Sequence, residues 1–410
     1  MLKRNSFVVT TALRLAALTG ICVILAAGCK KGDSAMPGVT ATEIKIGQSM
    51  PYSGPASSYG VIGQAETAYF KMINDKGGIN GRKVTLMSLD DAYNPGKAVE
   101  QTRKLIENDG VAFIFGSVGT ANNTATQKYL NEKKVPQLFI ATGADKWADP
   151  AANPWTIGWQ PSYRVEAKVY ARYLMKEKPG AKLCVLYQND DFGKDYLTGL
   201  KDALADQYEK VVIKTAAYEV TDPTVDSQIV TLQGAGCDAL LTAATPKFGA
   251  QSIRKVFDLN WKPLHFVSNV SVSLTAVLKP AGLDKSTGII TGQYLKDPSD
   301  PKLADDPGMN EYRAFIKQYM PGTEPTDGNA LYGFSVSGSL VKLLTACGND
   351  LSRANIMKQA ASVQKQIVPT LVDGIELNTS ATDFRPISQM RLAKFNGTSF
   401  EQMGDLISGD

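Results

Sequence analysis

Two series of short apolar segments, each alternating with amphipathic segments, constrain the fold of this 410-residue chain more than any other feature. The first series runs from "EIKIGQSM" to "VPQLFIATGA", and the second runs from "AKLCVLYQNDD" to "PLHFVSN". Strand-length apolar runs separated by helical periodicity are typical of parallel sheets, because parallel neighbours need a crossover connection between them. The two series therefore predict an α/β protein with two doubly wound parallel-sheet lobes.

The first 28 residues do not follow this pattern. They combine a basic start, "MLKRNSFVVTTALR", with an apolar run, "LAALTGICVILAAG", which is typical of a cleaved secretory signal. An uncleaved membrane anchor is the alternative, although the apolar run is shorter than a span of about 20 residues requires. The segment "LAAGC" resembles a bacterial lipobox, with Ala26 where that motif prefers Leu. We expect a periplasmic protein, with Cys29 as a possible lipidation site.

Charge and cysteine usage exclude several classes of function. Removal of residues 1–28 takes away three basic residues and no acid, so the formal net charge falls from +4 to +1. No basic block interleaved with aromatic residues is left, so we expect no nucleic-acid partner. The cysteines lack metal-ligand spacing and His265 is the only histidine, so we expect no metal site and no cofactor. His265 itself reads as a hydrogen-bonded strand residue.

Three cysteines lie beyond the N-terminal segment, at wide spacing. Cys184 and Cys237 lie in or beside apolar runs, whereas Cys347 follows a long helical pattern. A free cysteine in such surroundings packs as a small hydrophobic residue. We interpret Cys184 and Cys237 in this way, and a disulfide among the three remains the alternative.

The loops that follow the predicted strands are the candidate functional regions. They are rich in Gly, Ser, Thr and Asn, and ligands of open parallel sheets bind at the carboxyl ends of the strands. The loop "GSVGTANNTA" leads into a predicted helix, whose N-terminal N–H groups are suited to hold a carboxylate. Ordinary capping by Ser or Thr is an equally good interpretation of this loop taken alone.

The stretch "YQNDDFGKDY" places Asp190 and Asp191 side by side after an apolar run. Paired carboxylates suit a glycosidase-like dyad or a metal cradle, but neighbouring side chains project in different directions. Asp90 and Asp91 occupy the equivalent strand end of the other series, which indicates a repeated loop design. The sequence contains no nucleophile elbow and no phosphate-binding Walker loop. We predict that the chain is not an enzyme, and an exported hydrolase remains a weak alternative.

Several motifs in order resemble the branched-chain amino acid-type solute-binding proteins of ABC importers. They are "IKIGQSMPYSGPASSYG", "NDKGGINGRKVTLMSLDDAYNPGKA", "VAFIFGSVGT", "VPQLFIATGA" and "VLYQNDDFGKDY", and the resemblance extends from about Ile44 to Phe400. It implies a type I periplasmic binding protein fold with three crossover strands, in which the lobes close on a ligand. The implied lobes are 40–158 plus 294–370 and 159–293 plus 371–410, in a monomer. Trp159, in the first crossover, reads as hinge packing.

The resemblance also implies ligand contacts at nine positions: Tyr59, Gly119, Thr120, Ala141, Thr142, Gly143, Phe192, Thr245 and Asn269. The aromatic rings would pack on the ligand, and Gly119 or Thr120 would hold its carboxylate. The segment 141–144 would supply a second donor, through Thr142 or Gly143. In the loop that contains the paired acids, Phe192 would touch the ligand, while Asp190 and Asp191 cap the following helix and line the rim of the cleft.

Two of these positions depart from the pattern of the amino acid binders. Thr245 replaces an aromatic residue, and Asn269 replaces the acid that pairs with the ligand ammonium. Asn accepts a hydrogen bond but does not neutralise a cation. We therefore expect an acid without an α-ammonium, or an amide, to bind better than leucine, isoleucine or valine. Asp191 is the alternative source of the missing charge.

The function that follows is a receptor that captures a small carboxylate-type or amino-acid-like solute and delivers it to an ABC permease. A ligand sensor of the same fold, which regulates a signalling or operon partner, is the alternative.

Overall fold

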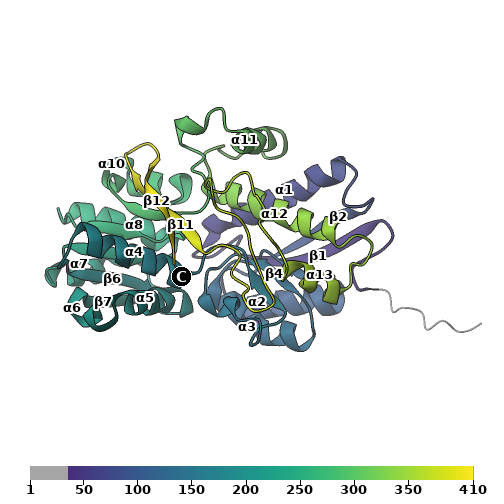
Figure 1. Ribbon diagram of the computed structural model, residues 1–410, viewed down its shortest axis with the longest axis horizontal. Helices are drawn as coiled ribbons and strands as arrows, with labels where there is room; N and C mark the ends of the chain where they lie inside the picture. The colour runs from purple at the N-terminus through teal and green to yellow at the C-terminus, as the bar shows by residue number, and fades with distance from the viewer. Residues whose placement is uncertain (1–35, 410) are drawn as a thin grey trace, which may run out of the picture. The chain divides into compact units, whose positions relative to one another are not determined.

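The described fold comprises residues 36–409 of a computed structural model, and its helices and strands belong to the unit Pro37–Asp410. The predicted secretory signal and Cys29 lie outside the described residues. Within this range the chain forms two sheets, each covered by helices on both faces (Figure 1). The predicted fold class, with two doubly wound parallel-sheet lobes, is confirmed.

The first sheet is entirely parallel, with the strand order β2-β1-β3-β4-β5 among the described residues. Its strands are β1 (Glu43–Met50), β2 (Lys83–Asp90), β3 (Ile114–Phe115), β4 (Gln137–Ile140) and β5 (Thr156–Gly158). Successive strand side chains point to opposite faces. Ile114 packs in a cluster with Leu130 of α3 (Thr120–Glu132), whereas the Phe115 ring contacts Phe70 of α1 (Gly60–Asp75). We call this sheet and its helices the first lobe.

The remaining helices of the first lobe come from both halves of the sequence. α1 packs against α12 from the second half, and the two lie side by side in Figure 1. α2 packs on α3, and α11 contacts α1. The bounds are α2 (Pro95–Arg103), α11 (Pro307–Tyr319), α12 (Gly328–Ala346) and α13 (Arg353–Ala360).

The second sheet has the order β12-β11-β10-β9-β8-β6-β7 in the described part of the chain. Strands β6 to β10 are parallel, whereas β11 pairs antiparallel with both β10 and β12. The bounds are β6 (Leu183–Gln188), β7 (Val212–Tyr218), β8 (Ala239–Ala243), β9 (Leu264–Val267), β10 (Ile290–Gln293), β11 (Gln389–Phe395) and β12 (Phe400–Ser408). This sheet and its helices form the second lobe.

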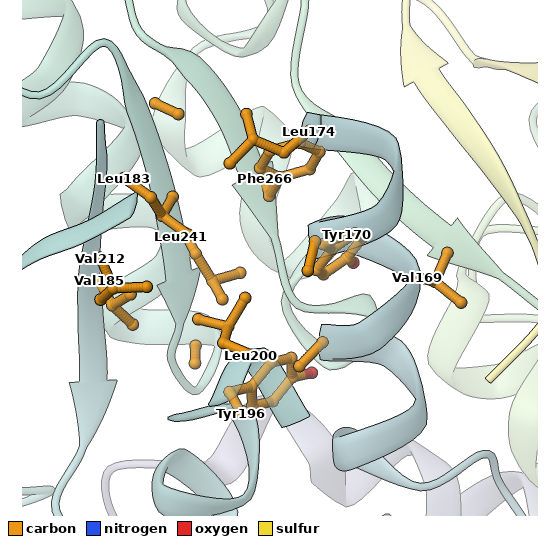
Figure 2. Packing of buried hydrophobic residues seen from close by; sticks show 14 of the residues in the cluster. Val169, Tyr170, Leu174, Leu183, Val185, Tyr196, Leu200, Val212, Leu241 and Phe266 are labelled. Atoms are coloured by element: carbon orange, nitrogen blue, oxygen red, sulfur yellow. The ribbon is translucent and has the colours of Figure 1, made fainter. Parts of the chain in front are cut away.

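Helices cover both faces of the second sheet, because the side chains of its strands also point alternately to the two faces. The bounds are α4 (Tyr163–Glu177), α5 (Asp191–Leu204), α6 (Tyr208–Val211), α7 (Asp226–Gly234), α8 (Pro246–Asp258), α9 (Lys279–Ala281) and α10 (Leu283–Ser286). Val185 and Leu241 pack under α4 and α5, where Tyr170, Tyr196 and Leu200 complete a buried cluster (Figure 2). Burial of each such side chain stabilises the fold by roughly 1.5–3 kcal/mol.

The described chain passes between the two sheets three times: after β5, after β10 and before β11. Trp159 lies in the first crossing and is fully buried, and its indole N–H donates to Ser339 Oγ of α12 at 3.0 Å. Its ring meets Tyr294 of the second crossing edge-on, with centroids 6.1 Å apart. Trp159 therefore packs against α12 and a second crossing segment, which confirms its interpretation as hinge packing.

The interpretation of Cys184 and Cys237 as free cysteines is wrong, because the two form a disulfide. Cys184 lies in β6, and Cys237 lies just before the neighbouring strand β8, with the two Cα atoms 5.7 Å apart. The 53 residues between them hide this proximity in the sequence. Cys347 is a buried free cysteine. His265 is a buried residue of β9 that bonds Thr242 Oγ1 at 2.9 Å, as predicted.

Candidate ligand-binding site

A cavity of about 140 Å³ lies where the carboxyl ends of the strands of both lobes meet. Seven of the nine predicted contact residues line it: Tyr59, Gly119, Thr120, Ala141, Phe192, Thr245 and Asn269. Thr142 and Gly143 are not among its lining residues. The sequence analysis missed further lining residues from loops, crossings and helices, among them Tyr93, Gln160, Tyr163, Tyr294 and Tyr332. Tyr93 lies in the loop after β2, and Tyr163 directly follows the first crossing. These positions in the sequence are a signal that could have identified both residues.

Gly119 and Thr120 form the N-terminal end of α3, at the first-lobe wall of the cavity. Gly119 has φ 101°, and a Cβ there would lie 2.7 Å from the Tyr93 ring, so the turn requires glycine. The first N–H groups of a helix have no partner inside it and carry the positive end of the helix dipole. This corner of the cavity is therefore suited to an anionic group.

Thr142 and Gly143 lie behind this corner. Thr142 Oγ1 lies 2.6 Å from Thr120 Oγ1 and accepts the Ala144 N–H at 3.3 Å, so it orients the Thr120 hydroxyl. The Gly143 carbonyl accepts the Tyr163 N–H at 2.7 Å, and a Cβ on Gly143 would lie 2.4 Å from the Pro161 carbonyl oxygen. Both residues therefore support the cavity wall by packing against other residues, and the structure places neither of them in it.

Aromatic side chains form much of the rest of the wall. Tyr59 is buried, and its hydroxyl donates across the cavity to the Val270 carbonyl at 3.0 Å. Phe192 meets Tyr163 edge-on, with centroids 4.7 Å apart, and both also contact Tyr196. Burial raises the pKa of Tyr59 and Tyr163, so their hydroxyls stay neutral. Phe192 therefore serves both the cavity wall and the core of the second lobe.

The loop of the paired acids begins α5. Asp190 is the N-cap, with Oδ1 accepting the Gly193 N–H at 3.3 Å and Oδ2 accepting from Gln188 at 2.7 Å. A Cβ on Gly193 would lie 2.1 Å from the Gln188 carbonyl oxygen, so only glycine fits there. The capping role predicted for Asp190 is confirmed.

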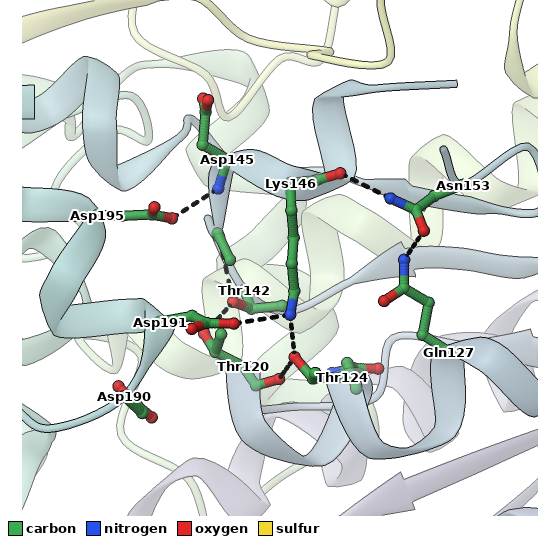
Figure 3. Close-up of polar contacts among 12 residues, drawn as sticks. Thr120, Thr124, Gln127, Thr142, Asp145, Lys146, Asn153, Asp190, Asp191 and Asp195 are labelled. Atoms are coloured by element: carbon green, nitrogen blue, oxygen red, sulfur yellow. Dashed lines mark hydrogen bonds and ion pairs between the residues drawn. The ribbon is translucent and has the colours of Figure 1, made fainter. Parts of the chain in front are cut away.

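Asp191 does not line the cavity, and its carboxylate pairs with Lys146 Nζ at 2.8 Å. Lys146 belongs to the first-lobe turn η3 (Asp145–Ala148) and also contacts Thr124. Beside this pair, Asp195 of α5 accepts the Asp145 N–H at 2.7 Å, and burial raises the Asp195 pKa to about 7 (Figure 3). Asp191 therefore joins the two lobes outside the cavity, and it is not the missing partner of a ligand ammonium.

Behind Asn269 lies a buried carboxylate that the sequence analysis missed. Glu166 of α4 is fully buried and accepts the Asn269 backbone N–H at 2.8 Å and the Asn269 side-chain amide N–H. It also accepts the Tyr196 hydroxyl at 2.6 Å and the Tyr170 hydroxyl. Burial raises the pKa of Glu166 to about 7, although these hydrogen bonds oppose the shift. The only sequence signal is an acid within the apolar stripe of α4.

Thr245 and several amides complete the polar groups around the cavity. Thr245 N–H donates to the Tyr218 hydroxyl at 2.9 Å, and the Thr245 side chain lines the second-lobe wall. Three lining residues have a buried polar atom with no hydrogen-bond partner in the described protein: Gln293 Oε1, Asn329 Nδ2 and the Tyr332 hydroxyl. These atoms suit a ligand that carries both donors and acceptors.

Neither a metal site nor a membrane span is found in the described part of the chain. No group of three His, Cys, Asp or Glu residues between 36 and 409 is arranged to hold a metal ion. None of the helices described in that range has the length and apolar character needed to cross a bilayer.

Comparison with known proteins covers almost the whole described chain. The sequence model of the family described as "Periplasmic binding protein" matches residues 43–399. Leu/Ile/Val-binding protein homolog 7 of Brucella suis biovar 1 is 25% identical over 308 residues, which are 71% of this chain and 74% of that protein.

Solved structures share the fold at lower identity. A branched chain amino acid ABC transporter protein from Thermus thermophilus with bound valine has a TM-score of 0.81 and 15% identity, covering 90% of this chain and 97% of that one. A fatty acid ABC transporter substrate-binding protein from Thermomonospora curvata has a TM-score of 0.74 and 22% identity, covering 91% and 94%.

Proposed function

Because this chain belongs to the periplasmic binding protein family, whose members are the non-enzymatic solute receptors of ABC transporters, we propose that it captures a small carboxylate-type or amino-acid-like solute in the cavity between its lobes. One observation carries the proposal: an α-helix N-terminus with a buried hydroxyl, that of Thr120, lies at a cavity whose wall includes several aromatic rings. Such a site pairs an anion with an apolar body.

The proposed binding residues are those that face the cavity. Gly119 and Thr120 hold the carboxylate, Tyr59 and Phe192 pack on the body of the solute, and Asn269 contacts its far end. Ala141 and Thr245 shape the two walls, while Thr142 and Gly143 act through Thr120 and Tyr163.

Capture in this proposal is a hinge motion of two lobes that comprise 40–158 plus 294–370 and 159–293 plus 371–410. Contacts that run from one lobe to the other support this view, such as those of Tyr59 with Val270 and of Lys146 with Asp191. The monomeric receptor then delivers the solute to the permease subunits of an ABC importer in the inner membrane. It works in the periplasm, and Cys29 is the proposed site of a lipid tether.

A thermal-shift screen tests the proposal. The screen contains amino acids, aromatic acids, short aliphatic acids, dicarboxylates and amides. A ligand at a thousandfold excess over its Kd stabilises the folded state by about 4 kcal/mol, which raises Tm by several degrees. We expect at least one carboxylate to do so and to be recovered unchanged. Turnover of the compound would refute the receptor role, and normal solute uptake after deletion of the gene would favour a sensor.

A pair of threonine variants tests the anion site. Thr120→Val removes the hydroxyl at the cavity, and we expect it to weaken carboxylate binding by about tenfold to a hundredfold, as for a hydrogen bond to a charged group. Thr126→Val is the matched control, because Thr126 is also buried on α3 but bonds the backbone of its own helix and the Gln137 side chain, and does not line the cavity. Equal loss in both variants would contradict the assignment of Thr120.

A further inference from the structure

We propose that Glu166, acting through Asn269, makes the second-lobe end of the cavity selective for a solute that presents a nitrogen-bound hydrogen there, such as an ammonium or an amide. Glu166 is a positioning residue in this proposal, because it does not line the cavity and acts on the solute through the Asn269 side chain. The inference rests on the proposed function and adds the chemistry of the solute end opposite the carboxylate.

The hydrogen bonds of Glu166 fix the orientation of Asn269. Its carboxylate receives both the backbone N–H and a side-chain N–H of Asn269, so the amide nitrogen points toward Glu166. An amide that turns its nitrogen inward leaves its carbonyl oxygen for the cavity. Among the described residues no donor is bonded to that oxygen, and Asn269 lines the cavity. The end of the cavity is thus a hydrogen-bond acceptor.

The charge behind Asn269 strengthens this acceptor. Hydrogen bonds from Tyr170, Tyr196 and Asn269 all reach Glu166 and oppose the effect of burial, which raises its pKa to about 7, so the carboxyl group is ionised above that pH. The donors that reach Glu166 in the described part of the chain are two tyrosine hydroxyls and the N–H groups of Asn269, all uncharged, so no neighbouring cation neutralises its charge. A polarised amide backed by an unpaired buried anion favours a positive or hydrogen-donating group in front of it.

This arrangement changes the expectation drawn from Asn269 alone. The sequence shows no acid at this strand end, which favours a solute without an ammonium. Glu166 comes from α4, more than a hundred residues earlier in the sequence, and its carboxylate lies behind Asn269 as seen from the cavity. We therefore infer that the solute carries a nitrogen donor as well as a carboxylate.

Matched pairs of acids test the inference. Leucine is compared with isocaproate, and phenylalanine with hydrocinnamate, because each pair differs only by the amino group. Calorimetric titration of the wild-type chain is expected to give at least tenfold tighter binding of one amino acid than of its partner. In Glu166→Gln we expect this ratio to fall at least fivefold, while the affinity for the acid without the amino group changes little.

Two further variants make the result specific. Glu66→Gln is the control, because Glu66 is equally buried, bonds Gln48 in the first lobe and has no contact with Asn269, so the ratio should be unchanged. Asn269→Ala removes the side chain through which Glu166 acts on the solute. It should lower the ratio of the two affinities as Glu166→Gln does. This variant keeps the test decisive if Glu166→Gln fails to fold.

The pH dependence gives a second readout. The titratable groups that face Glu166 are Tyr170 and Tyr163 of α4, Tyr196 of α5 and Tyr294 of the second crossing, and burial raises the pKa of each, so they stay neutral between pH 6 and 8. Amino acid binding should therefore weaken below about pH 7 as Glu166 takes up a proton, whereas binding of the partner acid should not.

The outcomes separate this inference from the proposed function. A wild-type preference for the acids without an amino group, or a ratio unchanged in both Glu166→Gln and Asn269→Ala, overturns the inference and leaves the receptor role intact. If the thermal-shift screen and the titrations show no binding of any carboxylate, the proposed function fails, and the inference fails with it.

Discussion

The hydrogen bond from Tyr59 to Val270 gives the sharpest test of lobe closure. Tyr59 belongs to the first lobe and Val270 to the second, so this 3.0 Å bond exists only while the lobes are together. Tyr59→Phe keeps the ring and removes the hydroxyl. Loss of one such bond costs about 1–3 kcal/mol when the acceptor is left without a partner. Val270 is only partly buried, so we take the lower end.

A cost of about 1 kcal/mol corresponds to roughly fivefold weaker binding. We expect this increase in Kd for the best ligand of the thermal-shift screen, measured by calorimetry. The Tm of the ligand-free chain should stay nearly constant, because the bond forms when the lobes close. The increase should arise mainly from a faster dissociation rate, since the bond holds the closed state.

Tyr52→Phe is the matched control for this experiment. The Tyr52 hydroxyl bonds Ser88 Oγ at 2.6 Å, and both residues belong to the first lobe. Its loss should lower the Tm with and without ligand and should leave Kd nearly unchanged. An unchanged Kd in Tyr59→Phe, or equal weakening in the two variants, would refute the link between this bond and closure.

Three further results are expected. Phe192→Ala should weaken binding by roughly 1–3 kcal/mol, because the ring forms part of the cavity wall. The same variant should lower the free energy of unfolding by about 3–5 kcal/mol in urea titrations, because the ring also packs in the core. Asp190→Asn should affect binding less. Burial raises the Glu166 pKa from 4.5 to about 7, so between these pH values the folded chain keeps a proton that the unfolded chain releases. The free energy of unfolding therefore falls by roughly 3 kcal/mol through this group as the pH rises from below 4.5 to above 7. Urea titrations at pH 5 and pH 8 should show a smaller loss in Glu166→Gln, and an equal loss would contradict the assigned shift. Reduction of the disulfide between Cys184 and Cys237 should cost about 2–4 kcal/mol, and a Tm unaffected by reductant would argue against the bond.

The sequence predicted those features that depend on local pattern. The alternation of apolar and amphipathic segments is a local signal, and it placed both sheets correctly. The capping role of Asp190 was predictable because an N-cap and its N–H partner lie three residues apart. The resemblance to the solute-binding proteins implied that Phe192 lies at the cavity, and its place directly after a strand end agrees with where ligands bind in open parallel sheets.

Features that depend on distant parts of the chain were not predictable in this way. Cys184 and Cys237 meet because β6 and β8 are neighbours in the sheet, which 53 intervening residues conceal. Glu166 reaches Asn269 from another element, and a lone acid on an apolar helix face does not reveal its partner. Gly143 was assigned to the cavity, but it packs on the first crossing, because spacing along a loop does not fix the direction of a residue.

The order in which the sheets receive their strands has a consequence for how the protein is made. Strand β10 is flanked by β11, which is synthesised almost a hundred residues later, and α1 is covered by α12 from the second half of the chain. A chain that emerges from the ribosome N-terminus first therefore leaves β10 with an open edge until the last strands arrive. Neither lobe is a continuous stretch of sequence that can be cut out, exchanged or expressed alone.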